Sequence, residues 1–113
     1  MTKVVFNPEH KKVLDAMLPN LTDVTGGKMF GYPAYYIHGK LFACIFEDGV
    51  GIKLPEDVAA GLLTNAQAVP FQPMGRPKMR EWVRIDHQSS EDYRHDEAVF
   101  LRSIEFVGSL KKK

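Results

Sequence analysis

The sequence predicts a single α+β domain, in which helices at the two ends of the chain pack on one face of an antiparallel sheet of about five strands. Apolar residues recur at helical spacing near both ends, and short segments of alternating character lie between them. The turns between those segments contain only a few residues, whereas a parallel crossover needs about a dozen or more. With 113 residues, the chain has the usual length of one domain, and we expect one unit over residues 1–113.

The first helix is predicted to begin at Asn7. Asparagine is a favoured N-cap residue, proline fits the first helical position, and Glu9 places an acid in the first turn. Apolar residues then follow at steps of three and four: Val13, Leu14, Met17, Leu18 and Leu21. Pro19 is expected to end this helix or to tighten its last turn.

The middle of the chain has the pattern of strands separated by glycine-containing turns. The predicted strands cover residues 25–32, 34–38, 41–46 and 50–54. His38-Gly39 and Glu47-Asp48-Gly49 lie between them, and glycine supplies the positive φ that tight hairpin turns require. This pattern predicts an antiparallel meander.

The second half of the chain predicts a short helix, a loop, one more strand and a final helix. Pro55-Glu56-Asp57 opens the short helix, residues 66–74 are expected to be mostly loop, and residues 79–85 a strand. Ser89 or Ser90 is the expected N-cap of the last helix. The inner stripe of that helix is formed by Tyr93, Phe100, Ile104 and Val107. Three amphipathic helices can cover one face of the sheet, which leaves the other face to solvent or to a partner.

Composition limits the class of protein. The net charge is +1, so the chain lacks the basic excess of a histone-like protein, and nucleic-acid binding would need a local patch. Cys44 is the one cysteine, which excludes an intrachain disulfide and is typical of a reducing compartment. The first residues contain no long apolar run, so we expect no signal peptide and no membrane helix, and we predict a cytoplasmic protein.

Residue types used in catalysis and metal binding are present, but not at the spacing that such sites require. Cys44 lies in the apolar segment LFACIF, and a pairing with His38 across the hairpin would lack a third group to orient the histidine. His87 and His95 lie among acidic residues without the spacing of a metal motif. Those acidic residues are Asp86, Asp92 and Asp96. We therefore expect no enzyme, no catalytic residue, no metal and no cofactor.

The segment RPKMREWVRI suggests one candidate binding face. Side chains alternate along a strand, which places one set on the same side: Arg76, Lys78, Arg80, Trp82 and Arg84. Cations beside an aromatic ring suit an anionic partner or single-stranded nucleic acid. The alternative is a solvated strand face on which arginine stems cover Trp82, and the acidic run 86–97 would neutralise the basic side chains within the protein.

Surplus hydrophobic residues suggest a second candidate face. Phe42, Cys44 and Phe46 are expected on one face of the strand 41–46, whose other face is apolar as well. If helices cover only one face of the sheet, the other is left as an apolar patch of the size that marks an interface. We expect a homodimer that buries this face through four candidate residues: Tyr36, Phe42, Cys44 and Phe46. The alternative is that the loop 66–77 folds over the same face.

A series of short motifs appears in a fixed order over residues 26–85. They are Met29-Phe30-Gly31, Gly39-Lys40 before Leu41-Phe42-Ala43, Lys53-Leu54 at the start of a short helix, Pro70-Phe71, and the strand that contains Trp82. In this order and spacing the chain resembles the TfoX N-terminal-domain family. The family usually has further glycines soon after Met-Phe-Gly, where this chain has Tyr32-Pro33-Ala34.

The resemblance implies a two-layer α+β domain similar in architecture to type III secretion chaperones, and it offers no catalytic motif to transfer. The full-length namesake looks like a competence regulator with a second, helical domain. This chain ends at Lys113, so we expect a stand-alone domain to which competence regulation does not transfer. Two classes of function remain. One is a non-catalytic regulatory or interaction module that binds protein or nucleic acid, and the other is a small enzyme or ligand binder that uses His38, Cys44 and the tyrosines.

Overall fold

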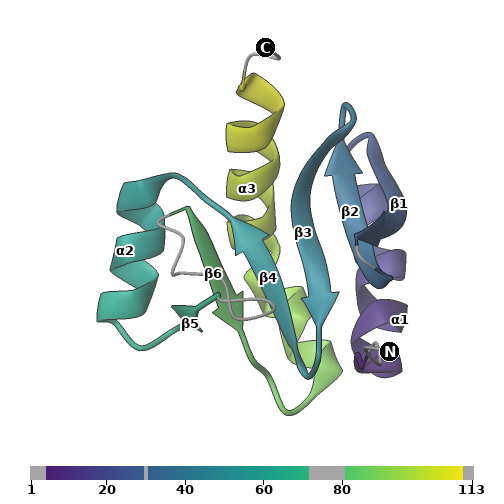
Figure 1. The fold of residues 1–113 in the computed structure, drawn as a ribbon, viewed down its shortest axis with the longest axis horizontal. Coiled ribbons are helices and arrows are strands. Elements are labelled where there is room, and N and C mark those ends of the chain that lie inside the picture. Colours follow the sequence, from purple (N-terminus) through teal and green to yellow (C-terminus); the bar gives the residue numbers. More distant parts are fainter. Residues whose placement is uncertain (1–4, 30, 72–80, 111–113) are drawn as a thin grey trace.

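The chain folds into two layers, one a β-sheet and the other a set of helices (Figure 1). The computed structural model describes residues 5–29, 31–71 and 81–110. Within these residues, six antiparallel strands form one sheet in the order β1-β2-β3-β4-β6-β5. The predicted α+β class and antiparallel sheet are confirmed. The strand beyond the expected five is β5, a two-residue segment within the predicted loop.

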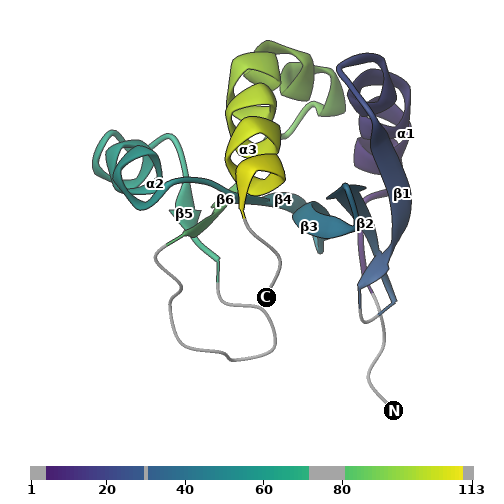
Figure 2. The same cartoon turned by 90° about the horizontal axis from the view of Figure 1, so that it is seen from above.

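The helical layer lies on one side of the sheet, which Figure 2 shows from above. It contains α1 (Pro8–Met17), α2 (Glu56–Thr64) and α3 (Glu97–Ser109). The main core lies between the two layers and includes the fully buried residues Leu14, Ile45, Ile52, Leu54, Val83 and Phe100. This arrangement confirms that the terminal helices pack on a single face. No helix in the described part of the chain is long and apolar enough to span a membrane.

The first helix begins where its capping residues predict. The Asn7 Oδ1 accepts hydrogen bonds from the backbone N–H groups of Glu9 and His10, at 2.9 and 3.4 Å. The buried face of α1 includes Val13 and Met17, as the apolar spacing indicates. The helix then tightens into a 3-10 turn, η1 (Leu18–Asn20), that contains the proline expected to end it.

The strands follow the predicted meander with small shifts at their ends. Their bounds are β1 Val24–Met29, β2 Tyr32–Ile37, β3 Lys40–Phe46, β4 Gly49–Lys53, β5 Val69–Pro70 and β6 Trp82–Ile85. His38 and Gly39 both have positive φ, 52° and 78°, which is the backbone geometry of a two-residue type I′ hairpin turn. The part of the predicted strand 79–85 before Glu81 lies outside the described residues.

A β-bulge between β2 and β3 changes which side chains share a face. Tyr35 pairs with Ala43 and Tyr36 pairs with Leu41, so Phe42 is the extra residue on β3. Phe42 and Ala43 consequently both lie in the helix-side core, while Leu41 packs on the opposite face. The prediction that Phe42 shares a face with Cys44 and Phe46 is therefore wrong, because strict alternation stops at the bulge.

The bulge is held from the helical layer by Ser103 of α3. Its buried Oγ lies 2.5 Å from the Lys53 carbonyl oxygen and 3.3 Å from the Phe42 carbonyl oxygen. The single hydroxyl hydrogen donates mainly to the nearer Lys53 carbonyl oxygen and is shared with the Phe42 carbonyl oxygen, so this contact ties α3 to two neighbouring strands.

The C-terminal helix begins later than the sequence predicts. A 3-10 helix, η3 (Ser90–Asp96), precedes α3, and Ser89 makes no side-chain capping hydrogen bond. Tyr93 of η3 is fully buried, and its hydroxyl donates to the Ile85 carbonyl oxygen at 2.8 Å. The predicted inner stripe from Tyr93 to Val107 is correct, although it runs across both elements.

Candidate interaction face

The side of the sheet away from the helices carries a second, smaller hydrophobic cluster, and we call it the outer face. Its buried residues are Tyr32, Ala34, Cys44, Phe46 and Phe71. Partly buried residues that we call the rim pack around them: Phe6, Met29, Tyr36, Leu41 and Trp82. The outer face is turned toward the viewer in Figure 1, where the strands lie in front of α3.

Aromatic rings form a continuous row across this face. The ring centroids of Tyr32 and Phe46 lie 4.8 Å apart, and those of Phe46 and Phe71 lie 5.6 Å apart. Phe71 and Trp82 follow, again at 5.6 Å. These distances fall in the range of favourable aromatic pairs, so the row joins β2 and β3 to β6.

Gly51 of β4 makes room for this row, and Gly49 makes room for Arg84 and Asp86. A Cβ atom on Gly51 would lie 2.8 Å from the Phe71 ring, and one on Gly49 would lie 1.9 Å from the Asp86 Oδ1. Both distances are too short for real contacts, so the outer face of β4 must lack side chains there. The alternation of glycine with Val50 and Ile52 in the segment GVGIK is a sequence signal that something lies against one face of this strand.

The described residues show what covers part of the outer face. Phe71, which follows β5 and is 2% exposed, lies over the centre of the sheet. This supports the alternative that residues from the loop 66–77 fold over that face, although residues 72–77 lie outside the described part. Burial of Cys44 and Phe46 therefore does not by itself require a second copy of the chain.

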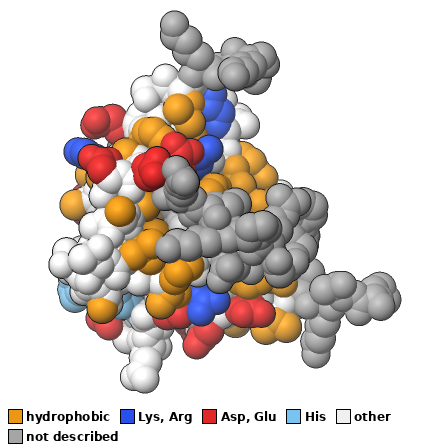
Figure 3. Space-filling view, turned by 60° about the vertical axis from the view of Figure 1, so that its left-hand side comes forward, with side chains coloured by type: hydrophobic (Ala, Val, Ile, Leu, Met, Phe, Trp, Pro, Cys, Tyr) orange, Lys and Arg blue, Asp and Glu red, His pale blue; other side chains and the backbone are white. Residues whose placement is uncertain are grey.

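The structure brings most of the described members of the two predicted sets of site residues to the same face. Tyr36 and Trp82 lie half-buried in the rim, while Cys44 and Phe46 lie beneath it. Alternation on β6 holds, since Val83 and Ile85 enter the helix-side core. Figure 3 shows hydrophobic side chains across the middle of the view, with acidic and basic side chains above and below them.

Only part of the predicted basic set can be placed. Arg76, Lys78 and Arg80 lie outside the described residues. Arg84 forms a two-pronged ion pair with Asp86, from Nε to Oδ1 and from Nη2 to Oδ2, both at 2.9 Å. The Glu47 Oε1 lies 4.0 Å from the Arg84 Nη1. The charge of Arg84 is thus matched by acidic neighbours of the same chain.

Cys44 lies in an environment that suppresses its reactivity. Its side chain is fully buried, and burial raises the pKa of the thiol to about 12, although a backbone hydrogen bond from Gly51 acts in the opposite direction. Cys44 pairs with Ala34 inside the sheet, whereas His38 is exposed in the β2–β3 turn. At neutral pH the thiol stays protonated, and a protonated thiol is a poor nucleophile and metal ligand.

A polar cluster on the helix side was missed by the sequence analysis. His10 is fully buried; its Nδ1 lies 2.6 Å from the Ser90 Oγ and its Nε2 lies 3.0 Å from the Asp48 carbonyl oxygen. The Tyr93 ring contacts both His10 and His87, with centroids 4.7 and 4.6 Å away. The sequence does contain a sign that His10 is buried: it lies on the apolar stripe of the first helix, three residues before Val13.

The same region contains His87, one of the two histidines that lie among acidic residues in the sequence. The His87 Nε2 pairs with the Asp96 Oδ2 at 2.7 Å, so this histidine already has an acidic partner. Among the described residues, no group of three or more histidine, cysteine, aspartate or glutamate side chains is arranged to hold a metal ion.

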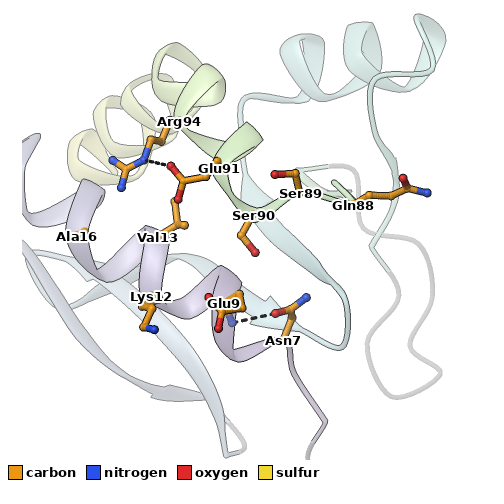
Figure 4. A pocket seen from close by; sticks show the side chains of 10 residues that line it. All are labelled: Asn7, Glu9, Lys12, Val13, Ala16, Gln88, Ser89, Ser90, Glu91 and Arg94. Atoms are coloured by element: carbon orange, nitrogen blue, oxygen red, sulfur yellow. Dashed lines mark hydrogen bonds and ion pairs between the residues drawn. The ribbon is translucent and has the colours of Figure 1, made fainter.

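A hollow of about 540 Å³ lies beside this cluster, between α1 and η3 (Figure 4). Glu9 and Lys12 line it from α1, and Glu91 and Arg94 line it from η3. The Arg94 Nε donates to the Glu91 Oε1 at 2.8 Å. Two acidic and two basic side chains therefore line the hollow, without an excess of either sign.

Comparison with known families agrees with the order of motifs in the sequence. The profile of the TfoX N-terminal domain matches residues 16–107 of the chain. That range extends the resemblance at both ends and takes in η1, the whole sheet and most of α3. No curated protein matches the sequence significantly. Because the matched range covers most of its length, the chain belongs to the TfoX N-terminal domain family.

Proposed function

We propose that this chain is a non-catalytic regulatory module of the cytoplasm that acts by binding a partner protein through the rim of the outer face. The observation that carries the proposal is the set of large, partly exposed side chains seated on a buried aromatic row. Met29, Tyr36, Leu41 and Trp82 each combine exposed area with packing against the outer-face cluster.

The rim has the composition and support of a protein-binding surface. Tryptophan, tyrosine and methionine are enriched in the cores of protein interfaces, and aromatic anchors contribute most of the binding free energy in many complexes. Trp82 stacks on Phe71, and the Tyr36 hydroxyl donates to the Lys28 carbonyl oxygen at 2.8 Å. Anchors held in this way lose little rotamer freedom on binding.

The reading of the molecule as an enzyme has less support. Its best nucleophile candidate, Cys44, is buried with a raised pKa, and the proposed histidine partner is exposed elsewhere. This geometry favours a structural role for the thiol. A stable packed cysteine fits a binding module as well as it fits any other class of domain.

Nucleic-acid binding remains the alternative function. Trp82 offers a stacking surface, but Arg84, the described cation on the same strand face, is paired with Asp86 and Glu47. An arginine that already has acidic partners contributes less to phosphate binding, because those pairs must be broken or shared. We therefore prefer protein binding over nucleic-acid binding as the proposed function.

The test compares two leucine substitutions. Leu41 lies in the rim, and Leu101 is 41% exposed on α3 in the helical layer. Proteins retained from host-cell extract by the wild-type chain are identified, purified and titrated against wild type, Leu41→Glu and Leu101→Glu. We expect Leu41→Glu to weaken binding by about tenfold or more, with Leu101→Glu unchanged. Equal affinities for all three chains would refute a role for the rim, and retention of oligonucleotides in place of proteins would favour the alternative.

A further inference from the structure

The first strand leaves one edge of the sheet open. β1 is the terminal strand and pairs only with β2, and Figures 1 and 2 show it at the end of the sheet beside α1. Its central residues, Thr25 to Lys28, are exposed, and no described strand lies on its other side. An open edge presents backbone N–H and C=O groups that can pair with another strand.

The backbone groups that face this edge belong to Val24, Gly26 and Lys28. Met29 pairs with Tyr32 next to a two-residue connection, and such a closing pair is hydrogen-bonded. Hydrogen-bonded and non-hydrogen-bonded pairs alternate along an antiparallel ladder, so Lys28 and Gly26 direct their backbone groups outward. The Lys28 carbonyl oxygen already accepts from the Tyr36 hydroxyl at 2.8 Å and has a second lone pair for a partner strand. Pro33 lies opposite Lys28 in a non-hydrogen-bonded pair, so its lack of an N–H removes no hydrogen bond between β1 and β2.

A hollow opens beside the same strand on its helix side. It has a volume of about 390 Å³, and its lining includes Gly26 and Tyr35, one acidic side chain, Asp15, and two basic side chains, Lys11 and Lys28. A Cβ atom on Gly26 would meet nothing within 4 Å. The Tyr35 hydroxyl donates to the Asp15 Oδ1 at 2.7 Å, which fixes the carboxylate at the hollow. The empty space is where a side chain from a neighbouring strand would fit.

We propose that two copies of the chain pair through their β1 edges, antiparallel, with Gly27 opposite Gly27 of the other copy. In this register Lys28 of each copy lies opposite Gly26 of the other, and opposed residues in a ladder share a face. Lys28 and Gly26 both belong to the helix side of β1, since Val24 two residues before Gly26 packs on the helix-side core. Each Lys28 side chain therefore enters the hollow over the other copy's Gly26.

Asp15 offers a carboxylate partner for an incoming lysine, and Lys28 of a second copy is the occupant that the open edge and the space over Gly26 fit. Lys28 forms no ion pair with another described residue, while Asp15 lies at the hollow that Lys28 of the other copy enters. Asp15 already accepts from the Lys11 Nζ at 2.6 Å, but a carboxylate has acceptor sites for a further donor. One strand thus supplies both the lysine and the space that receives it, which is the self-complementarity of a two-fold interface.

Charge substitutions and sedimentation velocity test the pairing. We expect the wild-type chain to dimerise, and Lys28→Glu and Asp15→Lys each to weaken its dimer by roughly tenfold or more, since both create like-charge contacts. An equal mixture of the two variants should restore dimerisation, because in the mixed dimer each contact joins opposite charges. The mixed sample also controls for damage to folding, since a misfolded variant cannot be rescued by the other.

A backbone substitution gives an independent check. Gly26→Pro removes an N–H that faces the open edge and leaves the β1–β2 hydrogen bonds in place, so we expect a folded monomer with an unchanged far-ultraviolet spectrum. A monomeric wild type at all concentrations would overturn the proposal. So would dimers that persist in Lys28→Glu and Gly26→Pro, or dimers that are lost only in Leu41→Glu, which would place the contact on the outer face.

Discussion

Gly51 and Gly26 form a matched pair of strand glycines that tests the packing of the outer face. A methyl group on Gly51 would lie 2.8 to 3.1 Å from three carbon atoms of the Phe71 ring, whereas one on Gly26 would meet nothing within 4 Å. Phe71 is 2% exposed and contacts the rings of both Phe46 and Trp82, so a shift of its ring would disturb both contacts.

The expected free-energy changes have opposite signs. Overpacking typically costs about 1–3 kcal/mol. Replacing glycine by alanine returns about 0.4–1 kcal/mol by restricting the unfolded chain. Gly51→Ala should therefore lower the free energy of unfolding by about 1–2 kcal/mol, while Gly26→Ala should raise it by about 0.4–1 kcal/mol. Their melting temperatures should differ by roughly 5–10 °C.

Urea unfolding followed by tryptophan emission measures both effects. Trp82 is the one tryptophan in the chain and lies 5.6 Å from Phe71 between ring centroids, so its native emission also reports a displaced Phe71. We expect a shifted native spectrum in Gly51→Ala and an unchanged one in Gly26→Ala. Equal stabilities and identical spectra for the two variants would show that Phe71 does not rest on β4 in solution.

Three further outcomes are expected. Because burial raises the pKa of Cys44 to about 12, the thiol should react with a disulfide reagent at neutral pH only at the rate of chain opening, and a rapid reaction of the folded protein would contradict its burial. Ser103→Ala should cost about 1–3 kcal/mol, because it removes a buried hydrogen bond to the backbone of the sheet. The matched Ser109→Ala on the exposed end of α3 should cost less than about 0.5 kcal/mol, and similar losses for the two variants would argue against the bridging role. Short oligonucleotides at low salt should show no binding at tens of micromolar protein; binding with a log–log salt slope near about −3 would instead restore the nucleic-acid reading.

Much of the fold could be predicted because local chemistry and tertiary structure agree. The Asn7 cap, the His38-Gly39 turn and the helical stripes each appear where their residues predict. Two features lay beyond that reasoning. The bulge at Phe42 depends on how β2 and β3 pair, and strict alternation contains no information about an extra residue. The 3-10 helix before α3 depends on the position of Tyr93 against the sheet.

The sequence predicts several residues of the candidate site, but it does not predict which residues pack around them. Tyr36 and Trp82 lie on the outer face, yet nothing in the local sequence indicates that Phe71 packs on Gly51, a contact across 20 positions of the chain. The two glycines of β4 indicate that something packs closely on this strand, but they do not indicate which residue it is. The same holds for His10, whose partners Asp48 and Ser90 come from distant segments.

The contact between His10 and Ser90 joins segments that leave the ribosome at very different times. The two residues are 80 positions apart, while the meander from β1 to β4 pairs neighbours along the chain. Local hairpins lose little chain entropy on closing and can form early, whereas a contact of this separation closes a loop of most of the chain. A nascent chain that has not yet released Ser90 from the ribosome would have to bury the imidazole of His10 without its hydroxyl partner. The contacts of α1 with Asp48 and Tyr35 can form with the meander, so we expect the docking of α1 to begin early and to be completed only when Ser90 has emerged.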